Sequence, residues 1–208
     1  MSLLHLVHPD VRTLDSYSAP HGHPPIKLDA NESPWPLPEP ARRALEARLG
    51  AIDLHRYPDP SLTDLRGALA LRLGGDPEQY VVGSGSDEII ALLATALRAP
   101  RNQRLKPVVS FPSPTFVMFG ITSRVHGWDV CEVALDNDWH IPLDEWRRQV
   151  KAQPPNVVYL ASPNNPTGNA FSEATVRAII ETSSDALVVL DGAYGAFTGS
   201  GLDHLFDS

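Results

Sequence analysis

The sequence has few of the features that would cross-link a chain or anchor it in a membrane. It contains one cysteine, Cys131, which cannot form an internal disulfide or build a cysteine-based zinc site by itself. No apolar run approaches the roughly 18 residues that a membrane span requires. The start, MSLLHLVHPD, lacks the basic region of a secretory signal. We therefore expect a cytoplasmic protein in which Cys131, within the strand-like stretch WDVCEVAL, is a small buried hydrophobe.

Basic residues are also scarce. The sequence has 17 Lys and Arg against 25 Asp and Glu, a formal net charge of −8, which opposes loose binding to nucleic acid. Only three of the basic residues are lysines, namely Lys27, Lys106 and Lys151. The pair His21 and His23 has no acids or cysteines nearby, so it makes a poor metal site. Any anionic ligand must therefore be held locally, and we expect no nucleic-acid, membrane or metal partner.

Prolines divide the chain into an early and a later part. Seven of the 20 prolines lie between Pro20 and Pro40, a density that excludes a continuous helix and favours extended segments and turns. Residues 1–38 are therefore predicted to form an extended amino-terminal arm. Residues 39–208 contain no internal repeat or long linker, and they are predicted to belong to one domain.

Within residues 39–208, helix-like and strand-like segments alternate. Helices are predicted over residues 41–49, from a Ser61 N-cap through Leu73, and over residues 87–97, 116–125, 143–151 and 173–182. Strands are predicted over residues 80–82, 107–111, 128–135, 157–161 and 186–191. Several of these strands are apolar throughout, which is typical of an α/β fold with a mostly parallel sheet flanked by helices. Such sheets bind ligands at the carboxyl ends of their strands.

The first of these strand ends is the glycine-rich turn in YVVGSGSDEIIALLATAL, residues 80–97. A helix that begins here presents free N–H groups and a partial positive charge, and Gly83 and Gly85 allow a phosphate to approach the backbone. Ser86 is either the N-cap of this helix or a phosphate donor. The dinucleotide-binding pattern fails because Glu88 stands where its third glycine should be, and the nucleotide P-loop and the serine-hydrolase elbow do not match either.

Three more strand ends carry side chains that suit a flat ligand. FPSPTFVMF contains Phe116, an aromatic of a type that is more often core but can stack on a ring. LASPNNPTGNAF offers the amide of Asn165, and cis peptide bonds are predicted at its Ser-Pro and Asn-Pro steps. VVLDGAYGAF ends its apolar run in Asp191, a carboxylate that needs a partner, with Tyr194 three residues later. Together these ends suit a phosphorylated nitrogen heterocycle.

Six stretches then occur in a recognisable order: KLDANESPWPLP, RYPDPSLTDLRGALA, VVGSGSDEII, FPSPTFVMF, ASPNNPTGN and LDGAYGAF. In this order they resemble the amino-terminal part of the histidinol-phosphate aminotransferases, which are fold-type I enzymes dependent on pyridoxal 5'-phosphate (PLP). The resemblance covers nearly the whole chain. It implies that residues 39–208 are a PLP-binding large domain whose carboxyl-terminal part is missing, and that the small domain is absent.

The resemblance also implies roles for residues around the cofactor ring. Asp191 would pair with the pyridinium nitrogen, which lets the ring accept electrons from the substrate. Asn165 and Tyr194 would hydrogen-bond the ring oxygen O3′, and Phe116 would stack against the ring face.

The rest of the implied site holds the phosphate and the substrate. Gly85, Ser86 and Asp87 would bind the phosphate at the helix start. Tyr57 would reach that phosphate from the other subunit of a homodimer, and Asn31 would lie near the substrate.

By the same resemblance, the complete enzyme would transfer an amino group between glutamate and imidazole-acetol phosphate in histidine biosynthesis. A threonine-phosphate decarboxylase, an aromatic aminotransferase of the same family, and a non-catalytic binding or dimerisation module remain open. The chain departs from the family in having Gly192 where a glutamate is common. It also has no lysine in the Ser-x-Ser-Lys-like context that supplies the covalent bond to PLP. No catalytic residue is therefore assigned, and the isolated chain is expected to be inactive.

Overall fold

The computed structural model describes residues 3–13, 26, 31–101, 105–198, 202 and 205. The chain divides into two compact units, one of Met1–Leu14 with Gly83–Ser208 and the other of Asp15–Val82. The boundary between Val82 and Gly83 lies inside residues 39–208, which are predicted to form one domain. The predicted boundary after residue 38 stays a prediction. None of the helices within these described ranges is both long and apolar enough to cross a membrane.

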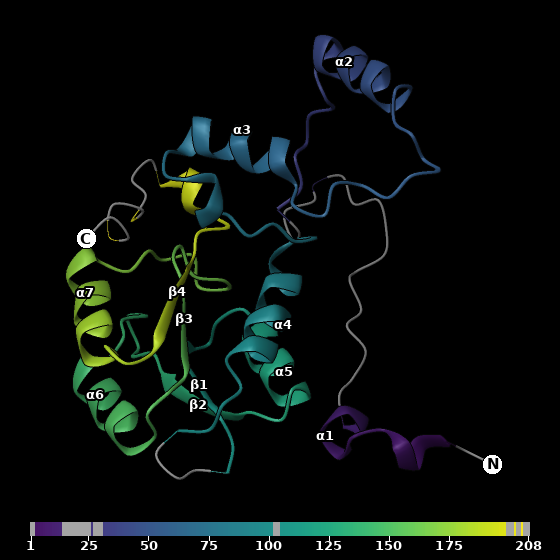
Figure 1. Cartoon of the computed structure of the whole chain (residues 1–208). Helices are drawn as coiled ribbons and strands as arrows, with labels where there is room; N and C mark the ends of the chain where they lie inside the picture. The colour runs from purple at the N-terminus through teal and green to yellow at the C-terminus, as the bar shows by residue number, and fades with distance from the viewer. Residues whose placement is uncertain are drawn as a thin grey trace. The chain divides into compact units, whose positions relative to one another are not determined.

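The larger unit is built on a four-stranded parallel sheet (Figure 1). Its strands are β1 (Val108–Ser113), β2 (Asp129–Ala134), β3 (Val157–Ala161) and β4 (Leu187–Asp191), in the spatial order β2-β1-β3-β4. All three strand pairs are parallel. The carboxyl ends of the strands therefore meet at one edge of the sheet, where parallel sheets bind ligands.

Two helices cover each face of this sheet (Figure 1). The helices α4 (Ser86–Ala96) and α5 (Met118–Val125) lie on one face, and α6 (Leu143–Ala152) and α7 (Glu173–Thr182) lie on the other. Successive residues of a strand point to opposite faces. In β3, accordingly, Tyr159 packs with the α4 and α5 cluster while Leu160 packs with the α6 and α7 cluster. Both clusters are buried, which confirms the predicted fold class.

The helices on the second face show how the sequence places its apolar residues. In α6, Trp146 and Val150 are four positions apart and both are buried, as expected of an amphipathic helix. The helix α7 begins at a serine cap, where Thr175 N donates to Ser172 Oγ over 3.1 Å. Cys131, on β2, is buried as predicted.

Three local predictions differ from the structure. Residues 80–82 form no strand, because no strand in the described part of the chain pairs with them. Ser61 does not cap α3 (Thr63–Leu73); Leu62 stands at the N-cap, and the Asp59 carboxylate accepts from Ser61 N and Thr63 N, each over 2.9 Å. These backbone hydrogen bonds hold the pKa of Asp59 below its usual value.

The amino-terminal arm is the third difference. Within its described part, the structure has two short helical turns, η1 (Leu3–Leu6) and α1 (Pro9–Arg12), where an extended chain is predicted. Both turns precede the proline-rich stretch, and Pro9 stands at a helix start, a position that proline tolerates.

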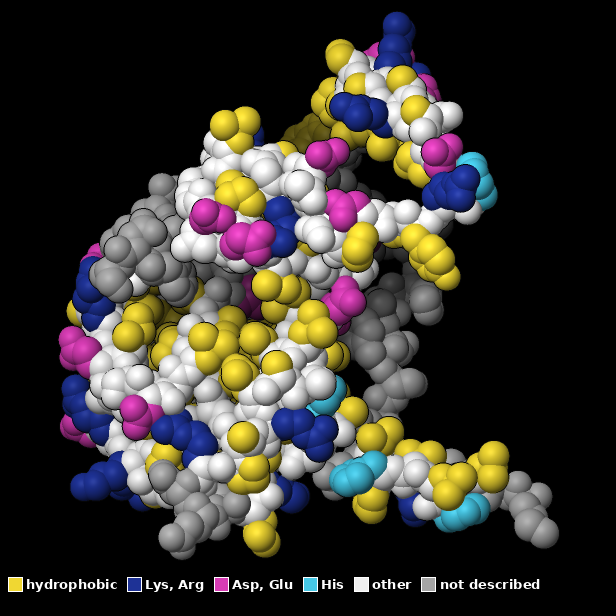
Figure 2. Space-filling model, viewed as in Figure 1, with side chains coloured by type: hydrophobic (Ala, Val, Ile, Leu, Met, Phe, Trp, Pro, Cys, Tyr) yellow, Lys and Arg dark blue, Asp and Glu magenta, His cyan; other side chains and the backbone are white. Residues whose placement is uncertain are grey.

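The smaller unit contains α2 (Glu39–Leu49), α3 and η2 (Pro77–Gln79), and none of these elements has a buried residue. Arg66 joins α3 to η2, since its Nε donates to Pro77 O over 2.8 Å. Hydrophobic side chains stand out on α2 in Figure 2, and Leu54 and Tyr57 in the following loop are almost fully exposed. The unit therefore has little core of its own among the described residues.

Candidate cofactor site

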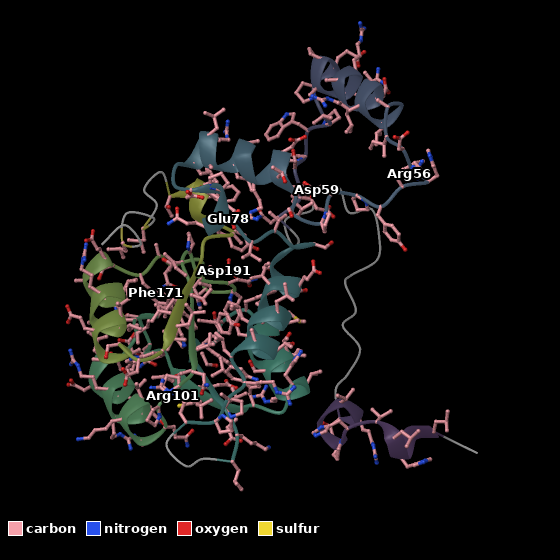
Figure 3. All side chains as sticks on the ribbon, in the orientation of Figure 1. Arg56, Asp59, Glu78, Arg101, Phe171 and Asp191 are labelled. Carbon is pink, nitrogen blue, oxygen red and sulfur yellow. The ribbon has the colours of Figure 1, made fainter. Side chains whose placement is uncertain are left out.

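Asp191 is the last residue of β4 and lies at the carboxyl edge of the sheet. Figure 3 shows it at the opposite end of the unit from Arg101. Its carbonyl oxygen accepts from Ser162 N over 3.0 Å, and its Oδ1 accepts from Ala193 N over 2.9 Å. The side chain is half-buried, and the structure gives Oδ2 no hydrogen-bond partner among the residues it describes. The carboxylate is thus held by the backbone through one oxygen and available through the other.

Tyr194 follows Asp191 on a tight turn. Gly195 N donates to Gly192 O over 2.8 Å, and Tyr194 precedes the short helix η3 (Gly195–Phe197). The phenol is half-buried, and its ring centroid lies 6.3 Å from that of Phe197. The predicted acid and phenol are therefore both placed at the end of β4.

The loop after β3 carries the predicted amide. The Ser162-Pro163 and Asn165-Pro166 bonds are both cis, as predicted. Asn165 is half-buried, whereas its neighbour Asn164 is buried, with 2% of its surface exposed. Asn165 was the predicted site residue of this loop, and Asn164 was not. The one indication of Asn164 in the sequence is that two asparagines precede Pro-Thr-Gly.

Phe116 lies in the loop after β1 and is half-buried. Its ring meets that of Phe119 edge to face at 5.5 Å, and Phe119 is stacked on Tyr159 at 4.5 Å. Burial raises the pKa of Tyr159 to about 12. The core aromatic cluster therefore supports Phe116 from one side, and part of the ring stays accessible to a ligand.

The start of α4 lies at the edge of the sheet where the strands end (Figure 1). Gly85 is the N-cap, with φ +83, a conformation that favours glycine, and no side chain caps the helix. Apart from Gly85 and its two chain neighbours, no described atom lies within 4 Å of the position that a Cβ on Gly85 would take. Ser86 and Asp87 form the first turn and are exposed. Ser86 is thus not the N-cap. The Glu88 carboxylate accepts from Ser84 N just before the helix, whereas no side chain caps the first turn itself, which suits an anion.

These features fit a flat phosphorylated heterocycle. A half-buried carboxylate, a phenol, an amide and an aromatic ring follow three adjacent strands, and an uncapped helix start lies at the same edge. The acid suits a protonated ring nitrogen, and the helix start suits a phosphate.

Two predicted residues belong to the other unit. Asn31 has a positive φ of 52 and is exposed, and Tyr57 is fully exposed. Because both residues belong to the smaller unit, their roles at the site on the larger unit stay predictions.

The described lysines lie away from the carboxyl edge of the sheet. Lys106 precedes β1, where its Nζ lies 3.8 Å from Asp129 Oδ1. Lys151 is near the end of α6, beside a hollow of about 380 Å³ at the amino ends of β3 and β4. Lys27, His21 and His23 lie outside the described residues.

Comparison with known proteins decides the family. The family model for aminotransferase class I and II matches residues 23–206. The chain belongs to this family. Its sequence is 38% identical over 195 residues to a histidinol-phosphate aminotransferase of Paracidovorax citrulli, and the match covers 92% of this chain and 52% of that protein. This member of the aminotransferase class I and II family therefore spans about half the length of the curated relatives it matches.

Solved aminotransferases share its fold. Histidinol-phosphate aminotransferase from Sinorhizobium meliloti, in complex with pyridoxal-5'-phosphate, is 29% identical with a TM-score of 0.59, over 73% of this chain and 40% of that one. A mutant aspartate aminotransferase from Thermus thermophilus is 22% identical with a TM-score of 0.70, over 88% of this chain and 50% of that one. The second match shows the fold alone.

Proposed function

We propose that this chain is the cofactor-binding part of a PLP-dependent aminotransferase of the histidinol-phosphate type. The observation that carries the proposal is Asp191, a half-buried carboxylate at the end of β4 with one oxygen available, beside the loops that present Asn165 and Phe116. The names of the relatives and the PLP complex of the Sinorhizobium enzyme support it.

Each residue at the strand ends has a defined task in this proposal. PLP, when bound, supplies an electron sink for the electrons released as the substrate loses its α-proton. Asp191 holds a proton on the ring nitrogen through a charge-assisted hydrogen bond. Asn165 and Tyr194 donate to the ring oxygen O3′, and Phe116 excludes water from one ring face.

The first turn of α4 binds the phosphate. The backbone N–H groups of Gly85, Ser86 and Asp87 and the Ser86 hydroxyl are its donors, and the helix dipole favours the negative charge.

The complete protein would use this site to transfer an amino group between glutamate and imidazole-acetol phosphate in the cytoplasm. It would be a homodimer in which Tyr57 reaches the partner's phosphate and Asn31 lies near the substrate. The exposed apolar side chains of the smaller unit support an interface there, because large exposed apolar patches mark contact surfaces.

A second candidate applies to the 208 residues alone. Lys106 and Lys151, the lysines within the described ranges, both lie away from the carboxyl edge of the sheet, which supports a binding module that holds PLP without catalysing transfer. A threonine-phosphate decarboxylase or an aromatic aminotransferase would use the same cofactor contacts, because most of the proposed residues bind PLP and do not determine which substrate is used.

Titration of the chain with PLP, followed by borohydride reduction and peptide mass spectrometry, tests both proposals. We expect saturable binding and no lysine modified in proportion to the bound PLP. Stoichiometric labelling of one lysine, with a red-shifted absorption band, would contradict the binding-module proposal. Absence of saturable binding would contradict the cofactor site in this chain.

A further inference from the structure

We propose that Asn164 is a positioning residue that fixes the spacing between the loops carrying Phe116 and Asn165. The inference rests on the proposed function, because those two residues are its proposed ring contacts. Asn164 directly precedes Asn165, and its hydrogen-bond partner Thr115 directly precedes Phe116, so each ring contact is one residue from the bridge.

Strand pairing does not fix the distance between the loops that follow β1 and β3. β1 pairs with β2 as far as Ser113 and Ala134, and β3 pairs with β4 as far as Ala161 and Asp191. β1 and β3, by contrast, pair only at Val109 with Val157 and Ser110 with Val158. The ladder between β1 and β3 therefore ends before their carboxyl ends, so another contact must hold the two following loops together.

Asn164 supplies that contact with every polar atom of its side chain. Its Nδ2 donates to Pro114 O over 3.0 Å and to Thr167 Oγ1 over 2.7 Å. Its Oδ1 accepts from Thr115 Oγ1 over 2.7 Å. Two of these bonds cross from the β3 loop to the β1 loop. Buried polar groups with complete hydrogen bonding specify one arrangement, whereas partly satisfied groups do not.

The direction of each bond follows from groups that can only accept. Pro114 O accepts, so Nδ2 must face it, and the Thr115 hydroxyl must then donate to Oδ1. On the other side, the Thr167 hydroxyl donates to Asn169 Oδ1, and Asn169 Nδ2 donates to Trp139 O over 3.0 Å. The bridge is thus one end of a directed chain that runs through the β3 loop.

The backbone of Asn164 is held as firmly as its side chain. Its N–H donates to Asn169 O over 2.8 Å, and its carbonyl oxygen accepts from Gly168 N over 2.8 Å. A change in the side chain therefore alters the link to the β1 loop while the turn around residue 164 keeps its own hydrogen bonds.

The test compares PLP affinity in matched variants of the chain. Asn164→Leu removes all three side-chain bonds and should weaken PLP binding at least tenfold. Thr115→Ser keeps the hydroxyl and should bind as the wild type does. Val176→Ala, in the buried core on α7, is the control for lost stability: it should lower the melting temperature and leave PLP affinity unchanged. Equal affinity in Asn164→Leu and the wild type would overturn the inference.

Hydrogen exchange in the absence of PLP separates this inference from the proposed function. Asn164→Leu should speed exchange in both loops, over residues 113–117 and 162–169, while Val176→Ala should not do so selectively. Unchanged protection of the β1 loop would overturn the bridge even if PLP binds. If the wild-type chain does not bind PLP, the cofactor proposal fails for this chain, and the exchange result still decides whether Asn164 sets the loop spacing.

Discussion

Replacing Asp191 by asparagine tests the charge at the centre of the proposed site. The amide oxygen of the introduced asparagine can still accept from Ala193 N, as Oδ1 of the aspartate does over 2.9 Å, so the turn after β4 should persist. The substitution replaces Oδ2 of Asp191 by an NH₂ group. This group donates hydrogen bonds, and it would face the proposed position of the protonated ring nitrogen. Folding stability should stay within about 0.5 kcal/mol of wild type, as for a substitution that breaks no buried contact.

The loss in cofactor affinity can be bounded from the type of bond removed. A hydrogen bond to a charged group contributes roughly 1.5–3 kcal/mol, and 1.4 kcal/mol corresponds to about tenfold in a dissociation constant. Asp191→Asn should therefore weaken PLP binding by about 10 to 150-fold.

The assay is a spectroscopic PLP titration with a control variant of equal charge. Asp185→Asn removes the same charge just before β4, at the other end of the strand. Asp185 is 86% exposed, and its ion pair with Arg101 at 3.4 Å is of a kind that contributes little. This control should bind PLP as the wild type does. Wild-type affinity in Asp191→Asn, or equal losses in both variants, would refute the assignment of Asp191 to the ring nitrogen.

Two further predictions concern the fold. The raised pKa of Tyr159, about 12, means that ionisation favours the unfolded chain from about pH 10 upward; urea titrations at pH 9 to 11 should therefore show the wild type losing more stability than Tyr159→Phe, and parallel losses would contradict this. The chain should elute as dimers or larger species in size-exclusion chromatography, because β4 is an edge strand among the strands that the structure describes. A stable monomer would contradict the dimer prediction.

The second of these predictions follows from the backbone of β4. Leu187 N donates to Asn156 O, and Ser162 N donates to Asp191 O, so the alternating pattern of a parallel ladder turns the N–H groups of Val188 and Leu190 away from β3. Figure 2 shows hydrophobic side chains gathered between α7 and α4, where β4 lies in Figure 1. Val188→Pro removes one outward donor and should reduce self-association.

The elements that the sequence predicted best are those decided by local pattern. β3 and α7 have the predicted ends, because an apolar run and an amphipathic stripe each end at a polar turn. The strand predicted over residues 80–82 was wrong, because a strand needs a neighbouring strand to pair with and β-propensity does not provide one. The predicted Ser61 N-cap of α3 was wrong, because Asp59 also lies close to the helix start. The Asp59 carboxylate accepts from the backbone N–H groups of Ser61 and Thr63.

The sequence predicted the residues of the candidate site that would contact the ligand. It did not predict the buried residue that holds their loops. Strand ends in a parallel sheet converge, so Asp191, Asn165 and Phe116 could be grouped from sequence alone. Which asparagine of the pair is buried depends on contacts with a loop 49 residues earlier, through Thr115. Sequence spacing holds no information on that contact, so Asn164 emerged only from the structure.

The strand order places two of the proposed ring contacts, Phe116 and Asn165, after the two central strands, β1 and β3. From β1 the chain crosses through α5 to β2 on one side, and from β3 it crosses through α7 to β4 on the other. These two crossovers leave the β1 and β3 pair in opposite directions, with their helices on opposite faces, and such a reversal of strand order opens a crevice at the strand ends of an open parallel sheet. Ligands bind in such crevices in open parallel sheets. The ladder between β1 and β3 ends early, and the side-chain hydrogen bonds of Asn164 link the two loops beyond its last pair.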